Sequence, residues 1–229
     1  EPLLPATIAL QNPHLIGGYS FYVFPKAEKI IVMIDQDGDE NYLPMLLPLE
    51  GGFPEHAFNG FFQGTRCHLG SCDAENGIFY LNAESRTEPA STGYRCNLVT
   101  GEVTALAKSE YGAYPSAHNK DHSKVVMSDG YTTGDTVIRL WEEGKEGLSL
   151  LFGIPLEERQ PGQQVPLNGI NSVNIVSQDR GLLITSAMFS DTFGPGYLDL
   201  SHPGDLIAVK VEGQVHTGMG EMEGTTKVN

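Results

Sequence analysis

The chain has few basic side chains and no long apolar run. Its 229 residues include 14 lysines and arginines against 29 acidic residues, which gives a formal net charge of −15. This excess of negative charge opposes binding to nucleic-acid phosphates or to an anionic membrane surface. No apolar stretch approaches the roughly 20 residues that a membrane-spanning helix needs. We therefore expect neither nucleic acid nor a membrane as a partner.

Cysteine is also scarce. The three cysteines, Cys67, Cys72 and Cys96, cannot form an even disulfide framework. The sequence contains no Asn-x-Ser/Thr glycosylation acceptor either. Together these two absences favour a reducing, cytoplasmic location.

Helical patterns are nearly absent. No apolar residues recur at a 3.6-residue period over a length that predicts a stable helix, and the one stretch with a mild helical pattern is Leu156-Glu157-Glu158-Arg159. Instead, β-branched and aromatic runs bounded by Gly, Pro, Asn and Asp occur throughout the chain. The hydrophobic content of 40% is enough for a core. The sequence therefore predicts an all-β fold.

One pattern recurs along the chain: a polar turn, a short apolar strand, a Gly-, Asp- or Asn-rich break, and a second strand ending in a charged hairpin. With Lys29, Gly77, Lys124 and Gly181 taken as equivalent, the spacings are 48, 47 and 57 residues. A candidate inner strand precedes each copy, at residues 16–23, 65–72, 114–118 and 170–176. Four hairpin-linked strands of this total length are typical of a β-propeller blade of roughly 40 to 50 residues.

The predicted architecture is thus a β-propeller of four-stranded antiparallel blades, of which about four are visible. The copies fall at approximately 16–58, 65–106, 114–151 and 170–217, and a polar tail occupies 218–229. Because each blade buries its faces against its neighbours, an open half-ring would expose two faces. Three explanations remain open: a piece of a longer protein, which we favour, a ring completed by self-association with a second copy, or a closed four-bladed ring.

Two segments of the first copy carry a family resemblance. Asp37-Gly38-Asp39-Glu40-Asn41-Tyr42 is followed by a strand and then by Leu49-Glu50-Gly51-Gly52. This order resembles the N-terminal propeller of the prolyl oligopeptidase family of serine peptidases, including its acylaminoacyl-peptidase-like and dipeptidyl-peptidase-like branches. Residues 97–106 match a more general blade ending that is shared with TolB-like propellers, which are the second resemblance.

The family resemblance implies a propeller of about seven or eight blades followed by an α/β-hydrolase domain. The nucleophile of that domain lies in a Gly-x-Ser-x-Gly elbow. This chain contains no Gly-x-Ser-x-Gly segment. We therefore expect no catalytic residue in this chain, and we expect any catalytic chemistry to lie in residues outside it.

A calcium-like spacing occurs in the first copy, where Asp35, Asp37 and Asp39 alternate. An EF-hand loop needs glycine at its sixth position and glutamate at its twelfth, but here these positions hold Glu40 and Leu46. A solvated hairpin is favoured over a calcium site.

Possible zinc ligands do not fit a known zinc motif. Cys67-His68 with Cys72, and His118 with His122, have no standard zinc spacing. Alternation along a strand should also send Cys67 and Cys72 to opposite faces. The two histidines lie in or beside a predicted turn, so we expect them to be exposed, and we expect neither a metal nor another cofactor.

Two segments that interrupt the repeat are the better functional candidates. Residues 84–92 lengthen the second copy and residues 188–204 lengthen the fourth. Extra loops on a repeat scaffold usually project from one face, where partners and substrates bind. The residues that could contact or gate a peptide are Arg86, Phe189, Phe193 and Tyr197. A variable surface loop without a binding role is the alternative.

Three functions are consistent with the sequence. The leading hypothesis is a non-catalytic propeller segment of a prolyl-oligopeptidase-like serine hydrolase, which filters peptide access to a hydrolase domain of the same full-length protein. The second is a free-standing TolB-like scaffold that binds a peptide or protein. The third is a propeller enzyme with a metal in its channel, of the lactonase or lyase type.

Overall fold

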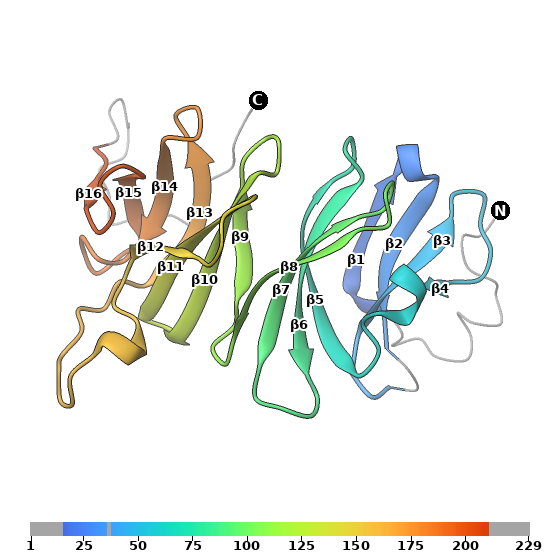
Figure 1. The fold of residues 1–229 in the computed structure, drawn as a ribbon, viewed down its shortest axis with the longest axis horizontal. Coiled ribbons are helices and arrows are strands. Elements are labelled where there is room, and N and C mark those ends of the chain that lie inside the picture. The colour runs from blue at the N-terminus through green and yellow to red at the C-terminus, as the bar shows by residue number, and fades with distance from the viewer. Residues whose placement is uncertain (1–15, 36–37, 211–229) are drawn as a thin grey trace. The chain divides into compact units, whose positions relative to one another are not determined.

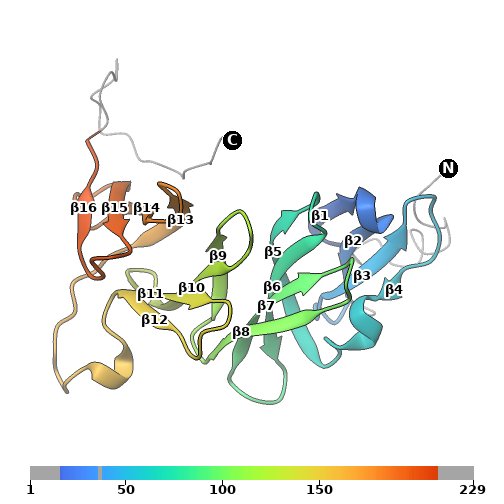
Figure 2. The same ribbon diagram turned by 45° about the horizontal axis from the view of Figure 1, so that its top comes forward.

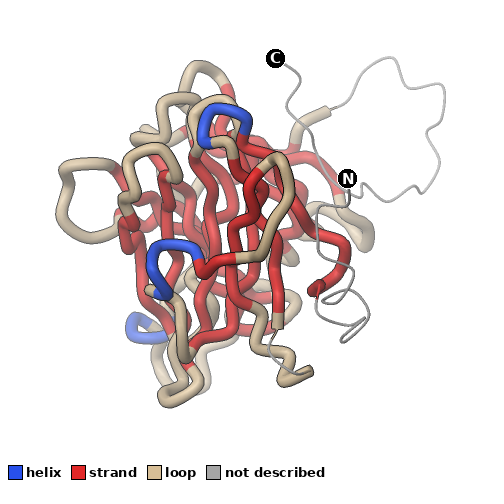
Figure 3. Tube along the Cα trace, turned by 90° about the vertical axis from the view of Figure 1, so that its right-hand side faces the viewer, coloured by secondary structure: helices blue, strands red, loops and turns tan. Residues whose placement is uncertain are grey.

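The structure, a computed structural model, describes residues 16–35 and 38–210 of the chain. Strands account for nearly all of its regular structure, and the helical segments are single 3₁₀ turns: η1 (Pro25–Ala27), η2 (Ala57–Gly60) and η3 (Leu156–Glu158) (Figure 3). The last of these coincides with the one stretch of helical pattern in the sequence. Within the described ranges, no helix is long and apolar enough to cross a membrane.

The strands form four sheets, each of four antiparallel strands in chain order (Figure 1). We call these sheets blades 1 to 4. Blade 1 contains β1 (Ile16–Phe24), β2 (Lys29–Ile34), β3 (Leu43–Pro48) and β4 (Glu55–His56), and blade 2 contains β5 (Thr65–Asp73), β6 (Ile78–Ser85), β7 (Ser91–Asn97) and β8 (Val103–Ser109). Blade 3 contains β9 (Tyr114–His118), β10 (Lys124–Thr132), β11 (Asp135–Glu142) and β12 (Ser149–Phe152). Blade 4 contains β13 (Ile170–Val176), β14 (Gly181–Ser186), β15 (Gly194–Asp199) and β16 (Leu206–Ala208). The predicted all-β class with four four-stranded blades is confirmed.

The first hairpin of every blade has the same length. Four residues separate the paired residues that close it, which are Phe24 and Lys29, Asp73 and Ile78, Asn119 and Lys124, and Val176 and Gly181. The residue equivalent to Lys29 in the second copy is therefore Ile78 rather than Gly77. Gly77 is the last turn residue, with a φ of +69° that favours glycine.

The chain divides into two compact units, residues 1–114 and 115–229, which we describe separately. In the first unit, the apolar residues of blades 1 and 2 share one core. Its buried members are Phe24, Ile31, Met33, Phe62, Cys67, Phe79, Leu81, Ala83 and Cys96. A backbone hydrogen bond of 2.8 Å from the Cys67 amide to the Tyr42 carbonyl also joins the two blades. Figure 2 shows blades 1 and 2 side by side.

The second unit is built in the same way from blades 3 and 4. Its buried core comprises Val126, Ile138, Leu140, Leu151, Phe152, Val173, Ile175, Leu182, Ile184, Leu198 and Leu206. Asn168 connects the two blades: its side chain accepts from the Thr136 amide (3.0 Å) and donates to the Thr136 carbonyl (2.7 Å), and its carbonyl accepts from the Ser186 hydroxyl. The amide side chain therefore supplies the partners that a neighbouring strand would otherwise provide.

The predicted insertion at 188–204 contains a strand that sequence reasoning missed. β15 lies inside it and pairs along its whole length with β14. Its sequence begins Gly194-Pro195-Gly196, residues that are depleted in strands. The pairing is retained because Phe189 packs over Gly196, where a Cβ would lie 2.9 Å from the Phe189 ring. The end of the predicted fourth copy, residues 211–217, and the predicted tail at 218–229 lie outside the described residues.

The predicted insertion at 84–92 is shorter than the sequence indicated. β6 continues to Ser85 and β7 begins at Ser91, so only residues 86–90 form the loop. Glu84 pairs with Ser91 and Ala83 pairs with Thr92. Glu84, Ser91 and Thr92 are polar but lie in strands, because the sheet extends beyond the apolar core.

Two expectations about side-chain direction are wrong. A register shift between Leu69 and Cys72 adds a residue to β5, so Cys67 and Cys72 both contact the core between blades 1 and 2 instead of facing opposite ways. His122 is only 2% exposed, and its ring stacks on that of His118 with centroids 4.5 Å apart. His122 also has a positive φ of 60°, which is uncommon for a residue other than glycine.

The acidic segment after β2 is not fully solvated. Asp35 is 4% exposed, and its carboxylate accepts a hydrogen bond of 3.3 Å from the Glu40 amide. Asp39 instead caps an exposed turn by accepting from the Asn41 amide at 2.9 Å. Asp37 lies outside the described residues, and no group of three or more His, Cys, Asp or Glu side chains suited to a metal is found within the described ones.

Candidate functional site

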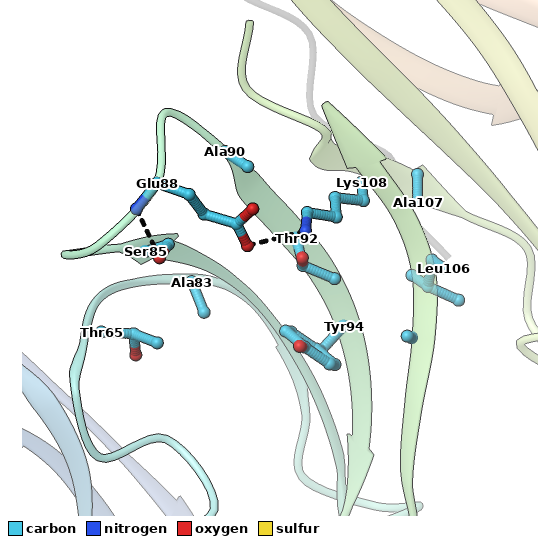
Figure 4. A pocket seen from close by; sticks show the side chains of 11 residues that line it. Thr65, Ala83, Ser85, Glu88, Ala90, Thr92, Tyr94, Leu106, Ala107 and Lys108 are labelled. Carbon is cyan, nitrogen blue, oxygen red and sulfur yellow. Dashed lines mark hydrogen bonds and ion pairs between the residues drawn. The ribbon is translucent and has the colours of Figure 1, made fainter. Parts of the chain in front are cut away.

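A pocket of about 530 Å³ lies on blade 2, entirely within the first unit (Figure 4). The four strands of blade 2 and the 86–90 loop form it, and each contributes small or hydroxylated side chains. The lining residues are Thr65, Ala83, Ser85, Glu88, Ala90, Thr92, Tyr94, Ala105, Leu106, Ala107 and Lys108. Four of these eleven residues lie within the predicted segment 84–92.

The alternation of side chains explains why a hollow forms here. Phe79, Leu81 and Ala83 point from β6 toward blade 1, and Ser85 continues this face beyond the end of the core. Along this face the side chains become smaller from phenylalanine to alanine and serine. The space that larger residues would fill is therefore left as the pocket.

Charged side chains mark the rim of the pocket. Lys108 of β8 donates to Glu88 of the 86–90 loop at 2.7 Å, and the two side chains are 58% and 54% exposed. The Ser85 hydroxyl accepts from the amides of Thr87 and Glu88 at 3.2 and 3.3 Å, which fixes the start of the loop. A surface ion pair of this kind contributes little to stability and can exchange partners with a ligand.

Aromatic rings support the floor of the pocket. The Tyr94 ring makes edge-on contacts with Phe61 and Phe62, at centroid distances of 5.7 and 5.4 Å. Phe62 is buried in the core, whereas Phe61 is 56% exposed. Phe61 and Phe62 thus fix the position of the Tyr94 ring, which gives the pocket an aromatic surface.

The buried thiol beside the pocket is not activated. Cys67 lies next to the lining residue Thr65, whose hydroxyl is 3.3 Å from its sulfur. Burial raises the pKa of the Cys67 thiol to about 12, and the hydrogen bond with Thr65 offsets only part of this shift. The thiol is therefore protonated at neutral pH.

Arg86, the predicted contact residue of the first unit, is next to the pocket but does not line it. Its side chain is exposed, and its backbone amide bonds to the Gly64 carbonyl at 3.4 Å. Its role in binding stays a prediction.

The three predicted aromatic residues belong to the second unit and lie near glycines in blade 4 or just before it. Tyr197 lies over Gly181, where a Cβ would come within 2.5 Å of the ring, and Phe189 lies over Gly196. Phe193 lies near Gly169. These contacts give each ring a packing role, and their part in peptide binding stays a prediction.

The sequence signalled part of this site and missed the rest. The break in the repeat indicated the loop that contains Glu88. Nothing in the sequence singled out Tyr94 or Lys108, because a tyrosine and a lysine in strands are ordinary residues. Only the sheet register places them beside this loop.

No known protein-family profile matches the chain, and no curated protein matches it in sequence. Among solved structures, the oligogalacturonate lyase of Vibrio parahaemolyticus is similar with a TM-score of 0.51 at 14% identity, over 76% of this chain and 46% of that protein. The fold is that of β-propeller blades.

Propellers of the two resembling families are also among the similar structures. A prolyl endopeptidase matches with a TM-score of 0.49 at 14% identity, over 82% of this chain and 29% of that one. TolB from Acinetobacter baumannii matches with a TM-score of 0.46 at 12% identity, over 80% and 41%. The chain spans less than half the length of each of these three proteins, and identities this low show a common fold alone.

Proposed function

We propose that this chain is a non-catalytic propeller segment that binds polypeptide. The blade 2 pocket carries the proposal, because it combines a rigid sheet, room for a large side chain and an aromatic floor. The formal charge of −15 disfavours polyanionic ligands.

The finer proposal follows from the sequence resemblance in blade 1. There residues 38–42 lie in the connection before β3, and residues 49–52 form the turn after it, where Gly51 and Gly52 have φ values of +90° and +148°. In a full-length protein of the prolyl oligopeptidase type, such a propeller would act as a steric filter. It would admit small or unfolded peptides to a serine hydrolase domain outside this chain.

The test uses the full-length natural gene product and a fluorophosphonate probe. The expected result is one labelled serine outside residues 1–229, with cleavage of short peptides and no cleavage of folded proteins. An unlabelled product would refute the hydrolase reading. Peptide binding without labelling would leave the alternative of a TolB-like scaffold that binds protein.

A further inference from the structure

The last strand of each blade lies at a sheet edge, and β8 is the longest of them. β8 has seven residues, whereas β4, β12 and β16 have two, four and three. In the described structure β8 pairs with β7 alone. Its other side therefore presents a row of backbone N–H and C=O groups that another strand could pair with.

This edge adjoins the pocket. Ala105, Leu106, Ala107 and Lys108 of β8 all line it, and a register shift opposite Gly93 and Tyr94 lies in the same stretch. A strand added to β8 would lie about 4.8 Å beyond it, with alternate side chains over the pocket. Ala105 pairs directly with Tyr94. On this face of the sheet, only the methyl group of Ala105 therefore lies between a side chain of the added strand and the Tyr94 ring. A large apolar side chain could reach across Ala105 to the ring.

The charges around β8 indicate what the added strand should carry. Exposed glutamates flank it at both ends, Glu102 before Val103 and Glu110 after Ser109, and Glu88 stands at the pocket rim. Lys108, the one basic residue of the strand, is already paired with Glu88. Basic residues at the two ends of a peptide would therefore meet complementary charge.

We propose that the β8 edge and the blade 2 pocket bind an extended peptide that has basic ends and a large apolar side chain at its centre. This inference rests on the proposed polypeptide binding and specifies where and how it occurs. The backbone of the peptide pairs with β8, its central side chain enters the pocket over Ala105, and its basic ends lie near Glu102 and Glu110.

The probe is the nonapeptide acetyl-Lys-Ser-Thr-Val-Phe-Val-Thr-Ser-Lys-amide with a fluorophore, titrated against the 229-residue chain by anisotropy. Two further versions of the peptide are N-methylated at alternate residues, one at the odd-numbered and the other at the even-numbered positions; we call these the two phases. Because an added strand bonds through every second amide, one phase should weaken binding about tenfold or more and the other should leave it nearly unchanged. Equal effects of the two phases would refute strand addition.

Variants of the protein test the other two contacts. Ala105→Phe fills the pocket and should weaken binding of the phenylalanine peptide about tenfold, while leaving a version with alanine at the centre unaffected. Glu102→Lys combined with Glu110→Lys should weaken binding most at low salt, whereas Glu75→Lys, at the exposed β5–β6 turn, should not. Circular dichroism checks that each variant is folded.

Outcomes for the two proposals are distinguishable. No binding of the nonapeptide, or binding that none of these changes weakens, overturns the β8 site. Fluorophosphonate labelling of the full-length product decides the hydrolase proposal independently. Changes in amide chemical shift on addition of the peptide, if confined to residues 103–109 and the pocket lining, would confirm the location.

Discussion

At the scale of single residues, Gly153 is the glycine, among the described ones, at which an added Cβ would come closest to a backbone atom, so its replacement should be costly. It follows β12 with a φ of +87°, and a Cβ there would lie 2.7 Å from the Thr136 carbonyl oxygen and 3.0 Å from the Val137 Cα. These are backbone atoms of β11, so they cannot move aside as a side chain would. Gly144 has a similar φ of +78° but nothing within 4 Å, and Gly130 has open space.

The three glycines predict a graded series. Gly153→Ala should lower the free energy of unfolding by about 2 to 4 kcal/mol through strain and overpacking, and Gly144→Ala by about 1 kcal/mol through strain alone. Gly130→Ala should change it by less than about 0.5 kcal/mol. Urea unfolding followed by the fluorescence of Trp141, the single tryptophan, measures all three within one unit. Equal effects at Gly153 and Gly144 would show that the backbone contact is not a constraint.

A second prediction concerns thiol reactivity. Burial raises the pKa of Cys72 from 9.0 to about 12, although this side chain is only partly buried. At pH 8 its thiolate fraction should be about a thousandfold lower than in the unfolded chain. Iodoacetamide labelling, quantified by mass spectrometry, should therefore be slow, rise about tenfold per pH unit, and accelerate in urea. Fast labelling of folded protein at pH 8 would contradict the raised pKa.

The raised pKa of Cys72 also makes the stability of the fold depend on pH. Because the folded state holds the neutral thiol, its contribution is complete below pH 9 and is lost as the pH rises from 9 toward 12. Cys72→Ser should reduce this alkaline loss of stability, as measured by urea unfolding at pH 8 and pH 10.

At the scale of elements, the connection from β12 to β13 is long and almost without regular structure, but it is fixed at both ends. Arg159 donates two hydrogen bonds to Asp135, at 2.7 and 2.9 Å, and two to the Ile154 carbonyl. Its guanidinium lies 4.9 Å from the centre of the Tyr131 ring. Asn168 fixes the other end on Thr136. The connection is therefore an ordered part of the second unit.

Removing the arginine should release this connection. Arg159→Ala leaves Asp135, which is 8% exposed, without its charged partner, and should cost about 2 to 4 kcal/mol. Arg159→Lys should be intermediate because an ammonium group cannot make the two-pronged contact. Limited proteolysis should then cleave within residues 154–166. Lys145→Ala, which removes an exposed ion pair with Glu142, is the control and should change neither measurement.

At the scale of the whole molecule, the net charge predicts a salt effect. With a formal charge of −15 on 229 residues, the acidic side chains of the folded protein repel one another and destabilise it. Raising the NaCl concentration from 10 to 150 mM shortens the screening length from about 30 to about 8 Å and should raise the melting temperature by a few degrees. A constant or falling melting temperature by circular dichroism would show that local ion pairs outweigh the repulsion.

The repeat made most of the strands predictable. The four inner strands were found within one residue, because β-branched runs between turn residues reflect local physics. Of the apolar strands that follow them, the third was predicted to end at Ser128, but β10 continues to Thr132. β15 was missed because its Gly-Pro-Gly start has low strand propensity, and a phenylalanine from the preceding loop compensates for this. The side-chain direction of Cys72 was wrong because a bulge cannot be read from alternation alone.

The sequence by itself determined the all-β class, the four copies and their turns, because periodicity and turn chemistry are local properties. It also determined the net charge of −15, which disfavours polyanionic partners. Only the tertiary structure decided which side chains meet, such as Tyr94, Lys108 and Glu88 around one pocket and His122 against His118. It also made β8 the longest of the last strands of the blades. These features depend on sheet register and on packing between strands far apart in the chain, which no local pattern specifies.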